Sequence, residues 1–149
     1  MKRSGALTPL SRDHHTALAI ALRLRRAQSP ADDRQAFLQF FDQEGRVHFA
    51  IEEDVLLPAV SDVLPATDAD IRRMLQEHAQ IRERAVLLSS EHGASAGSLC
   101  ELGELLASHV RHEERTVFPR IESLLGEDRL ADLQEQLQRA EVRSRRDGS

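Results

Sequence analysis

Two stretches of the chain place a histidine four residues before a glutamate. His48 and Glu52 lie within HFAIEEDVLLP, and His109 and Glu113 lie within HVRHEERTVFP. Both stretches read histidine, apolar residue, two variable residues, two glutamates, two variable residues, two apolar residues and proline. Residues four apart on an α-helix share one face. Each pair therefore offers an imidazole and a carboxylate to one metal ion, and two such helices facing each other could hold two ions.

The rest of the sequence predicts helices that can position these pairs. Only 3% of the residues are aromatic, and no run of strand length alternates apolar and polar residues. Thr8–Pro9 and Ser29–Pro30 each combine an N-capping residue with a proline suited to the first turn. Thr67, with Asp70 as its capping-box partner, predicts a third helix start. We predict helices over residues 8–28, 30–58, 67–92 and 98–125, with a helix end or kink at Pro58.

Four helices with short connections predict an all-α fold, an antiparallel up-down four-helix bundle with an additional C-terminal helix. We expect a single domain, with the bundle over about residues 7–125, the extra helix over about 127–143 and a frayed tail over 144–149. The extra helix is amphipathic. It either folds over the bundle or makes the chain a homo-oligomer, and its apolar positions are Leu130, Leu133, Leu137 and Ala140.

Charge and composition exclude several classes of partner. The net charge of −5, with both signs interspersed, gives no reason to expect nucleic-acid binding. No apolar run approaches the roughly 20 residues that span a bilayer, and nothing resembles a signal peptide. The single Cys100 cannot form an internal disulfide, and we interpret it as a small core residue. We therefore expect a soluble, cytoplasmic protein with no membrane partner.

Each of the other two bundle helices contributes one histidine to its apolar stripe. These are His14 and His78, which follow an acidic residue in both cases. His15 is an alternative to His14, but its own stripe matches the third helix less well. His92 is about 21 Å from His78 along a helix, too far to share a site.

Several neighbours of these residues could extend the site. His112 occupies the position in HVRHEERTVFP that Ile51 occupies in HFAIEEDVLLP, so it lines the core, lies just outside the ligand shell or is an added ligand. Glu44 lies one turn before His48 and could be a third carboxylate or accept a hydrogen bond from an imidazole. The acidic residues beside the candidate ligands are expected to be exposed or to lie just outside the ligand shell: Asp13, Glu53, Glu77 and Glu114.

Four inward histidines and two inward glutamates are costly to bury without partners. A single His–Glu pair at this spacing is more often a surface ion pair than a pair of metal ligands. Here both pairs lie on apolar stripes, and the second pair recurs with the same pattern of flanking residues. Imidazole and carboxylate without thiolate suit iron, manganese or zinc. We assign Glu52 and Glu113 as bridging carboxylates, as in di-iron bundles. The terminal ligands are His14, His48, His78 and His109, with their division between the two ions left open.

On these motifs, over about residues 7–125, the chain resembles the hemerythrin-like, HHE cation-binding family. The resemblance implies a non-haem di-iron centre in a four-helix bundle, with room for an oxo or hydroxo bridge and with zinc or manganese as substitutes. Oxygen-carrying hemerythrins have a second histidine four residues after the one that matches His78, where this chain has Arg82. The remaining set is similar to bacterial di-iron proteins linked to repair of iron centres, which often carry a Cys-containing N-terminal segment that is lacking here.

The leading hypothesis is a di-iron protein that binds, senses or handles O2, NO or peroxide. One alternative is an enzyme: an oxidase, a ferroxidase or an iron-centre repair protein acting under nitrosative or oxidative stress. The chain has no Tyr or Trp, the usual radical and electron-relay side chains, which disfavours demanding oxidations. The other alternative is a metal-stabilised helical interaction module, with zinc as a suitable metal.

Overall fold

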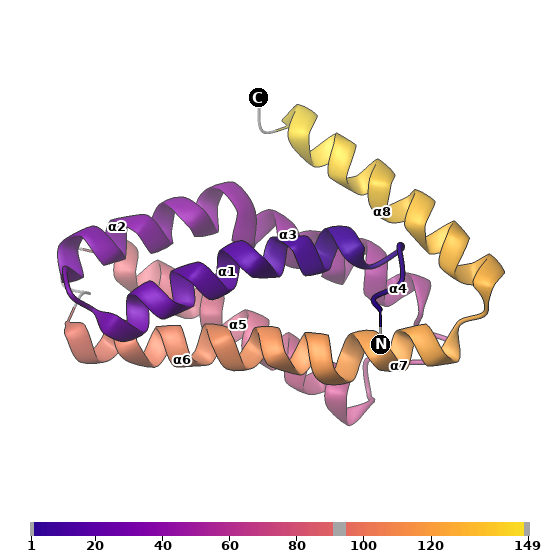
Figure 1. Cartoon of the computed structure of the whole chain (residues 1–149), viewed down its shortest axis with the longest axis horizontal. Coiled ribbons are helices and arrows are strands. Elements are labelled where there is room, and N and C mark those ends of the chain that lie inside the picture. Colours follow the sequence, from indigo (N-terminus) through magenta and orange to yellow (C-terminus); the bar gives the residue numbers. More distant parts are fainter. Residues whose placement is uncertain (1, 91–94, 148–149) are drawn as a thin grey trace.

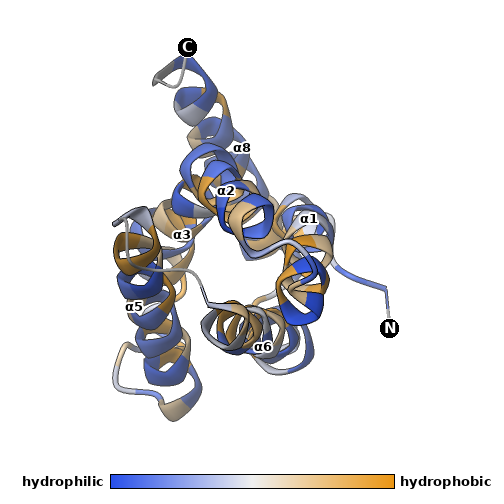
Figure 2. Cartoon of the chain, turned by 90° about the vertical axis from the view of Figure 1, so that its left-hand side faces the viewer, coloured by the Kyte–Doolittle hydropathy of each residue, from blue (hydrophilic) through white to orange (hydrophobic). Residues whose placement is uncertain are grey.

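The structure, a computed structural model, describes residues 2–90 and 95–147. Within these residues four antiparallel helical rods form a bundle, and a further helix crosses it from outside (Figure 1). Viewed end-on, α1, α2, α5 and α6 surround a common centre, and α8 lies beyond α2 (Figure 2). The predicted all-α bundle with an added helix is confirmed. The rods are α1 (Thr8–Arg26); α2 (Pro30–Phe40), η1 (Phe41–Gly45), α3 (Arg46–Ile51), η2 (Glu52–Leu56) and α4 (Leu57–Ala59); α5 (Ala69–Ser89); and α6 (Ala96–His112), η3 (Glu113–Val117) and α7 (Phe118–Leu124).

Two predicted N-caps are corrected by the structure. Thr8 is the first residue of α1 and not its N-cap, a position that Leu7 takes without a side-chain hydrogen bond, and α1 ends at Arg26 and not at residue 28. Ser29 precedes α2, and the second rod ends at Ala59, directly after Pro58, as predicted. The N-cap of α5 is Asp68 and not Thr67. The Asp68 backbone is extended, with ψ of 139°, and its carboxylate accepts hydrogen bonds from the N–H groups of Asp70 and Ile71. The predicted end of this helix at His92–Gly93 lies outside the described residues.

The segments η1, η2 and η3 are π-helical turns inside continuous rods. In η2 the N–H of Leu57 donates to the carbonyl of Glu52, and in η3 the N–H of Phe118 donates to Glu113. Pro58 and Pro119 follow these two turns. A proline ring clashes with the carbonyl four residues back in an α-helix, and the wider π turn before each proline accommodates it. Such turns are frequent at functional sites.

The polar centre of the bundle divides the apolar core into two clusters. One cluster packs where α1 begins and α7 ends, around Leu10, Met74 and Phe118. The other fills the opposite end, around Leu24 and Leu99. In each rod a histidine lies between residues of the two clusters, and these four are His14, His48, His78 and His109.

The α8 helix (Glu127–Asp147) packs along one side of the bundle. It contacts α3 and η2, and Leu133, Leu137 and Ala140 join the first core cluster. Arg129 fixes its start through two bonds to Asp62 at 2.8 Å. The helix runs four residues past the predicted end at Arg143. Self-association through it stays a prediction.

Gly103 sets the distance between α1 and α6. A Cβ at this position would lie 2.6 Å from the carbonyl oxygen of Ala21, so only glycine permits the approach. Cys100, on the same helix, is half-buried, so its assignment to the core is wrong. In the described chain, no helix has the length and apolarity needed to cross a membrane.

Candidate metal centre

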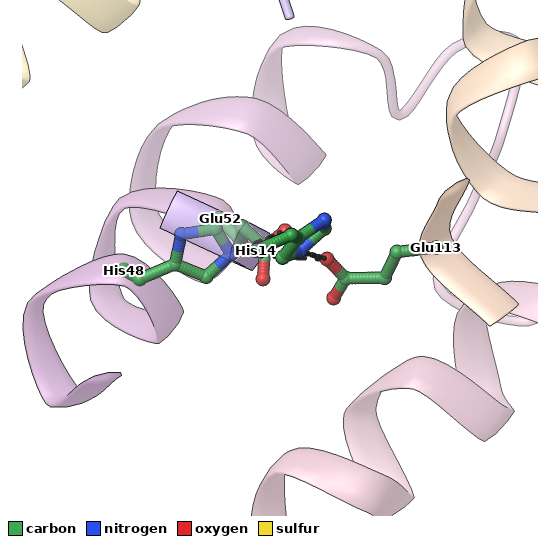
Figure 3. Close-up of side chains that lie close together, drawn as sticks. All are labelled: His14, His48, Glu52 and Glu113. Atoms are coloured by element: carbon green, nitrogen blue, oxygen red, sulfur yellow. Dashed lines mark hydrogen bonds and ion pairs between the residues drawn. The ribbon is translucent and has the colours of Figure 1, made fainter. Parts of the chain in front are cut away.

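The structure brings all six predicted site residues together at the centre of the bundle. They form two groups of buried side chains, and within each group the potential ligand atoms lie within 4.8 Å of one another. Figure 3 shows the first group, in which His48 and Glu113 project toward each other from opposite rods. The first group is His14, His48, Glu52 and Glu113, and the second is Glu52, His78, His109 and Glu113.

The two groups share Glu52 and Glu113, and each group takes its two histidines from one helical hairpin, that is, from one pair of consecutive rods. His14 and His48 come from the first two rods, whereas His78 and His109 come from the last two. Each half of the repeated sequence therefore supplies both imidazoles of one group and one of the two shared carboxylates. This division was left open by the sequence.

The arrangement of the buried polar atoms fits a bound cation. Both carboxylate oxygens of Glu52 and the Nε2 atoms of His48 and His109 have no hydrogen-bond partner among the described residues. They nevertheless lie close to other site atoms. The Nε2 of His48 is 3.2 Å from Glu52 Oε2, and the Nε2 of His109 is 2.8 Å from Glu113 Oε2. Because these contacts lack hydrogen-bond alignment, the atoms converge on shared space, which a metal ion would satisfy.

The four imidazoles are oriented by a second set of carboxylates. The Nδ1–H of each histidine donates to an acidic side chain at 2.7–3.0 Å. This bond fixes the ring and leaves Nε2 facing the centre, as in carboxylate–histidine–metal triads. The pairs are His14 with Glu114, His48 with Asp13, His78 with Glu53 and His109 with Glu77.

These acceptors are the residues that flank the candidate ligands in sequence. Consecutive positions of an α-helix differ by about 100°. Glu52 therefore reaches the centre while Glu53 reaches sideways to His78 on the neighbouring rod. Two acceptors bond a histidine of their own hairpin and two cross to the other hairpin, which follows the approximate symmetry of the repeat.

Arginines bind three of the four acceptors. Arg82 donates to both oxygens of Glu53, at 2.8 and 3.0 Å, and its guanidinium lies 5.5 Å from the ring centre of Phe49. Arg73 donates to Glu77 and Arg3 to Glu114. Arg82, four residues after His78, supports the carboxylate that accepts the Nδ1–H of that histidine. Sequence reasoning missed these arginines.

The metal-free centre prefers protonated imidazoles. Burial by itself lowers the pKa of His14, but hydrogen bonds to Glu113 and Glu114 outweigh it and raise the value to about 9. The same balance raises the pKa of His78 to about 11. Burial opposes ionisation of Glu113, yet the charge of His109 and hydrogen bonds hold its pKa well below the usual range. Protons thus compensate the buried carboxylate charge that a cation would otherwise neutralise.

The remaining candidates lie outside both groups. His15 is exposed on α1, so His14 is the histidine that faces the centre. His112 is buried, but its Nε2–H donates to the carbonyl of Asp70 at 2.9 Å. Glu44 is exposed. His92 lies outside the described residues.

Apolar side chains enclose the centre. The rings of Phe49 and His78 stack with centroids 3.9 Å apart, and Phe118 stacks on His14 at 5.5 Å. Beside the centre is a cavity of about 20 Å³ between η1 and the site. Its lining combines site histidines with mostly apolar residues, including Ala17, Phe40, Phe41, Phe49, Ile81, Leu106 and Val110.

Comparison with known proteins gives one match. The family described as the hemerythrin HHE cation-binding domain matches residues 6–121, a range that contains all six site residues. Searches among curated proteins and among solved structures returned no match.

Proposed function

The chain belongs to the hemerythrin HHE cation-binding family, and from that premise we propose that it is a di-iron protein that binds, senses or otherwise handles a small oxidant: O2, NO or peroxide. One observation carries the proposal. Two overlapping groups of buried ligands share Glu52 and Glu113, which come from facing rods. Carboxylates shared in this way bridge the two ions of di-iron helix bundles.

The donor set supports iron at both positions. Two imidazoles and two shared carboxylates per ion suit iron, and also manganese or zinc. His14 and His48 would hold one ion, and His78 and His109 the other. Bound iron would supply redox chemistry and open coordination positions for an exogenous ligand.

The protein's own residues orient the ligands and restrict access. The four Nδ1–H bonds hold the imidazoles with Nε2 toward the centre, so little rearrangement is needed on binding. The aromatic and aliphatic walls limit the access of bulk water to the site. The cavity of about 20 Å³ has room for a molecule the size of a water, which favours a diatomic ligand or peroxide over an organic substrate.

The proposal is tested by loading the purified protein anaerobically with Fe(II) and titrating it with NO, O2 or hydrogen peroxide. We expect a change in visible absorption that saturates at a fixed ratio to bound iron. Glu113→Ala, which removes a carboxylate common to both ligand groups, should abolish it, whereas His15→Ala, an exposed neighbour of the site, should preserve it. A protein that takes up only zinc, or that holds iron without responding to any of the three, would contradict the proposal and favour a metal-stabilised interaction module.

A further inference from the structure

Asp13 differs from the other three carboxylates that bind the site imidazoles. Its side chain is 52% exposed, whereas those of Glu53, Glu77 and Glu114 are 10–29% exposed. Among the described residues, no arginine contacts Asp13, and its one side-chain partner is His48, at 2.9 Å. Moving this carboxylate therefore breaks one hydrogen bond, to His48, and no bond to an arginine.

The opposite hairpin is held more firmly. Displacing Glu53 would break its bond to His78 and both bonds to Arg82. His78 is fully buried and His109 is 1% exposed, compared with 7% for His48. The His14–His48 half and the His78–His109 half therefore have similar ligands, but they differ in solvent exposure and in how firmly the carboxylates behind the histidines are held.

A surface groove of about 740 Å³ reaches the His14–His48 half, whose carboxylate Asp13 has no arginine partner among the described residues. Asp13 and His48 line it together with residues of η1, α3 and the last turns of α8. His48 is thus more than nine-tenths buried, has an Nε2 without a hydrogen-bond partner, and lines a groove open to solvent. Four acidic and two basic side chains line the groove, namely Asp13, Asp42, Glu44, Glu141, Arg46 and Arg145.

The charge of this groove favours cations. Arg145 is already paired with Glu141 at 2.9 Å, and Arg46 donates to the backbone carbonyl of Asp42. Asp42 and Glu44 make no side-chain ion pair among the described residues, so their charges act on the groove itself. With four acidic and two basic side chains the groove has a net negative charge, and such a field raises the local concentration of cations and their rate of association.

We propose that the His14–His48 half of the centre exchanges its ion with solvent through this groove, with Asp13 as the movable inner residue, whereas the His78–His109 half retains its ion. This inference rests on the proposed two-ion centre. It assigns unequal roles to halves whose ligand sets are chemically alike. The exchangeable ion enters past Asp42 and Glu44, meets Asp13 and reaches the Nε2 of His48.

The test follows Fe(II) uptake and its removal by a coloured chelator, anaerobically, on the full chain. We expect two phases of removal, each about one ion per chain. His48→Ala should lose the fast phase and keep the slow one, and His78→Ala should do the reverse. Circular dichroism checks that each variant folds.

The groove is tested with the double variant Asp42→Asn/Glu44→Gln. We expect uptake of the exchangeable ion to slow roughly threefold to tenfold at low salt, with a smaller effect at high salt and unchanged final iron content. The matched control Glu83→Gln/Asp132→Asn removes the same charge from exposed positions outside the groove and should leave the rate unchanged. Equal slowing in both pairs, no slowing in either, or removal of both ions in a single phase would overturn the inference. Iron content near one per chain or below would instead count against the proposed function.

Discussion

Arg82 holds the carboxylate of Glu53 through both terminal nitrogens, at 2.8 and 3.0 Å. Glu53 in turn accepts the Nδ1–H of His78 at 2.7 Å. Hydrogen bonds from His78 and Arg82 outweigh burial and lower the pKa of Glu53 to about 2, so this carboxylate stays ionised at neutral pH. A charged side chain at the protein surface is thereby coupled to the orientation of a fully buried imidazole.

Removing this arginine should weaken metal binding without removing a ligand. For Arg82→Ala we expect an affinity loss of roughly 10–100-fold at the His78–His109 position, the range typical of partners that orient metal ligands. Arg82→Lys should recover only part of the loss, because it cannot bind both oxygens. Chelator competition gives the affinities. Arg84→Ala, which removes a 3.6 Å surface pair with Glu101, is the control, and an equal effect there would contradict the role of Arg82.

The choice of histidine on α1 can be tested directly. His14→Ala should reduce bound iron from about two to about one per chain, since His14 belongs to only one of the two ligand groups. His15→Ala should leave the content unchanged, because His15 is exposed. Elemental analysis after iron loading distinguishes them. Loss of iron in the His15 variant alone would show that the wrong histidine has been assigned.

The metal-free protein should lose stability as the pH rises above neutrality. The folded-state pKa of His14 is raised to about 9 and that of His78 to about 11, both above the ordinary value of 6.5. Their contribution is therefore fully present below pH 6.5 and is lost as the pH rises through 9. The melting temperature of the metal-free protein should fall between pH 6.5 and 9.

Iron should reverse this dependence, because metal binding requires deprotonated imidazoles and releases their protons. The melting temperature of the iron-loaded protein should not fall over the same pH range. Calorimetry of iron binding in buffers of different ionisation enthalpy should detect released protons at pH 7.5. A metal-free melting temperature that rises with pH, or binding without proton release, would contradict the charge balance described for the site.

The contact at Gly103 predicts an unusual sign for a glycine-to-alanine change. Alanine normally stabilises a helix, but a Cβ at Gly103 would meet the backbone of Ala21 at 2.6 Å and that of Arg25 at 3.0 Å. Gly103→Ala should therefore destabilise the protein by about 1–3 kcal/mol. Gly97→Ala, whose Cβ would have open space beyond a 4.0 Å contact, should be neutral or slightly stabilising. Urea denaturation measures both, and equal stabilities would argue against close packing of α1 on α6.

The sequence sufficed for the six central residues because their positions follow from helix geometry alone. His48–Glu52 and His109–Glu113 need only the one-turn spacing, and the other two histidines interrupt apolar stripes that must face inward. Their pairing into two groups needed the order of the rods around the bundle. That order depends on packing and not on local spacing.

Other features were hidden from the sequence for physical reasons. The bond from Glu53 to His78 crosses between rods, so no local pattern reveals it. The π turns differ from an α-helix by the register of a few backbone hydrogen bonds, which propensity does not resolve. Thr67 and Asp68 are both good N-caps, and the backbone conformation at Asp68 decides between them.

The central claim is that Glu52 and Glu113 bridge two iron ions, and Mössbauer spectroscopy combined with elemental analysis tests it most directly. The protein would be loaded anaerobically with ⁵⁷Fe(II), then oxidised and measured in an applied field. We predict about two iron ions per chain and a diamagnetic ground state from a coupled ferric pair, with the coupling lost in Glu113→Ala. Two uncoupled high-spin ferric ions, or a single iron per chain at saturation, would contradict it.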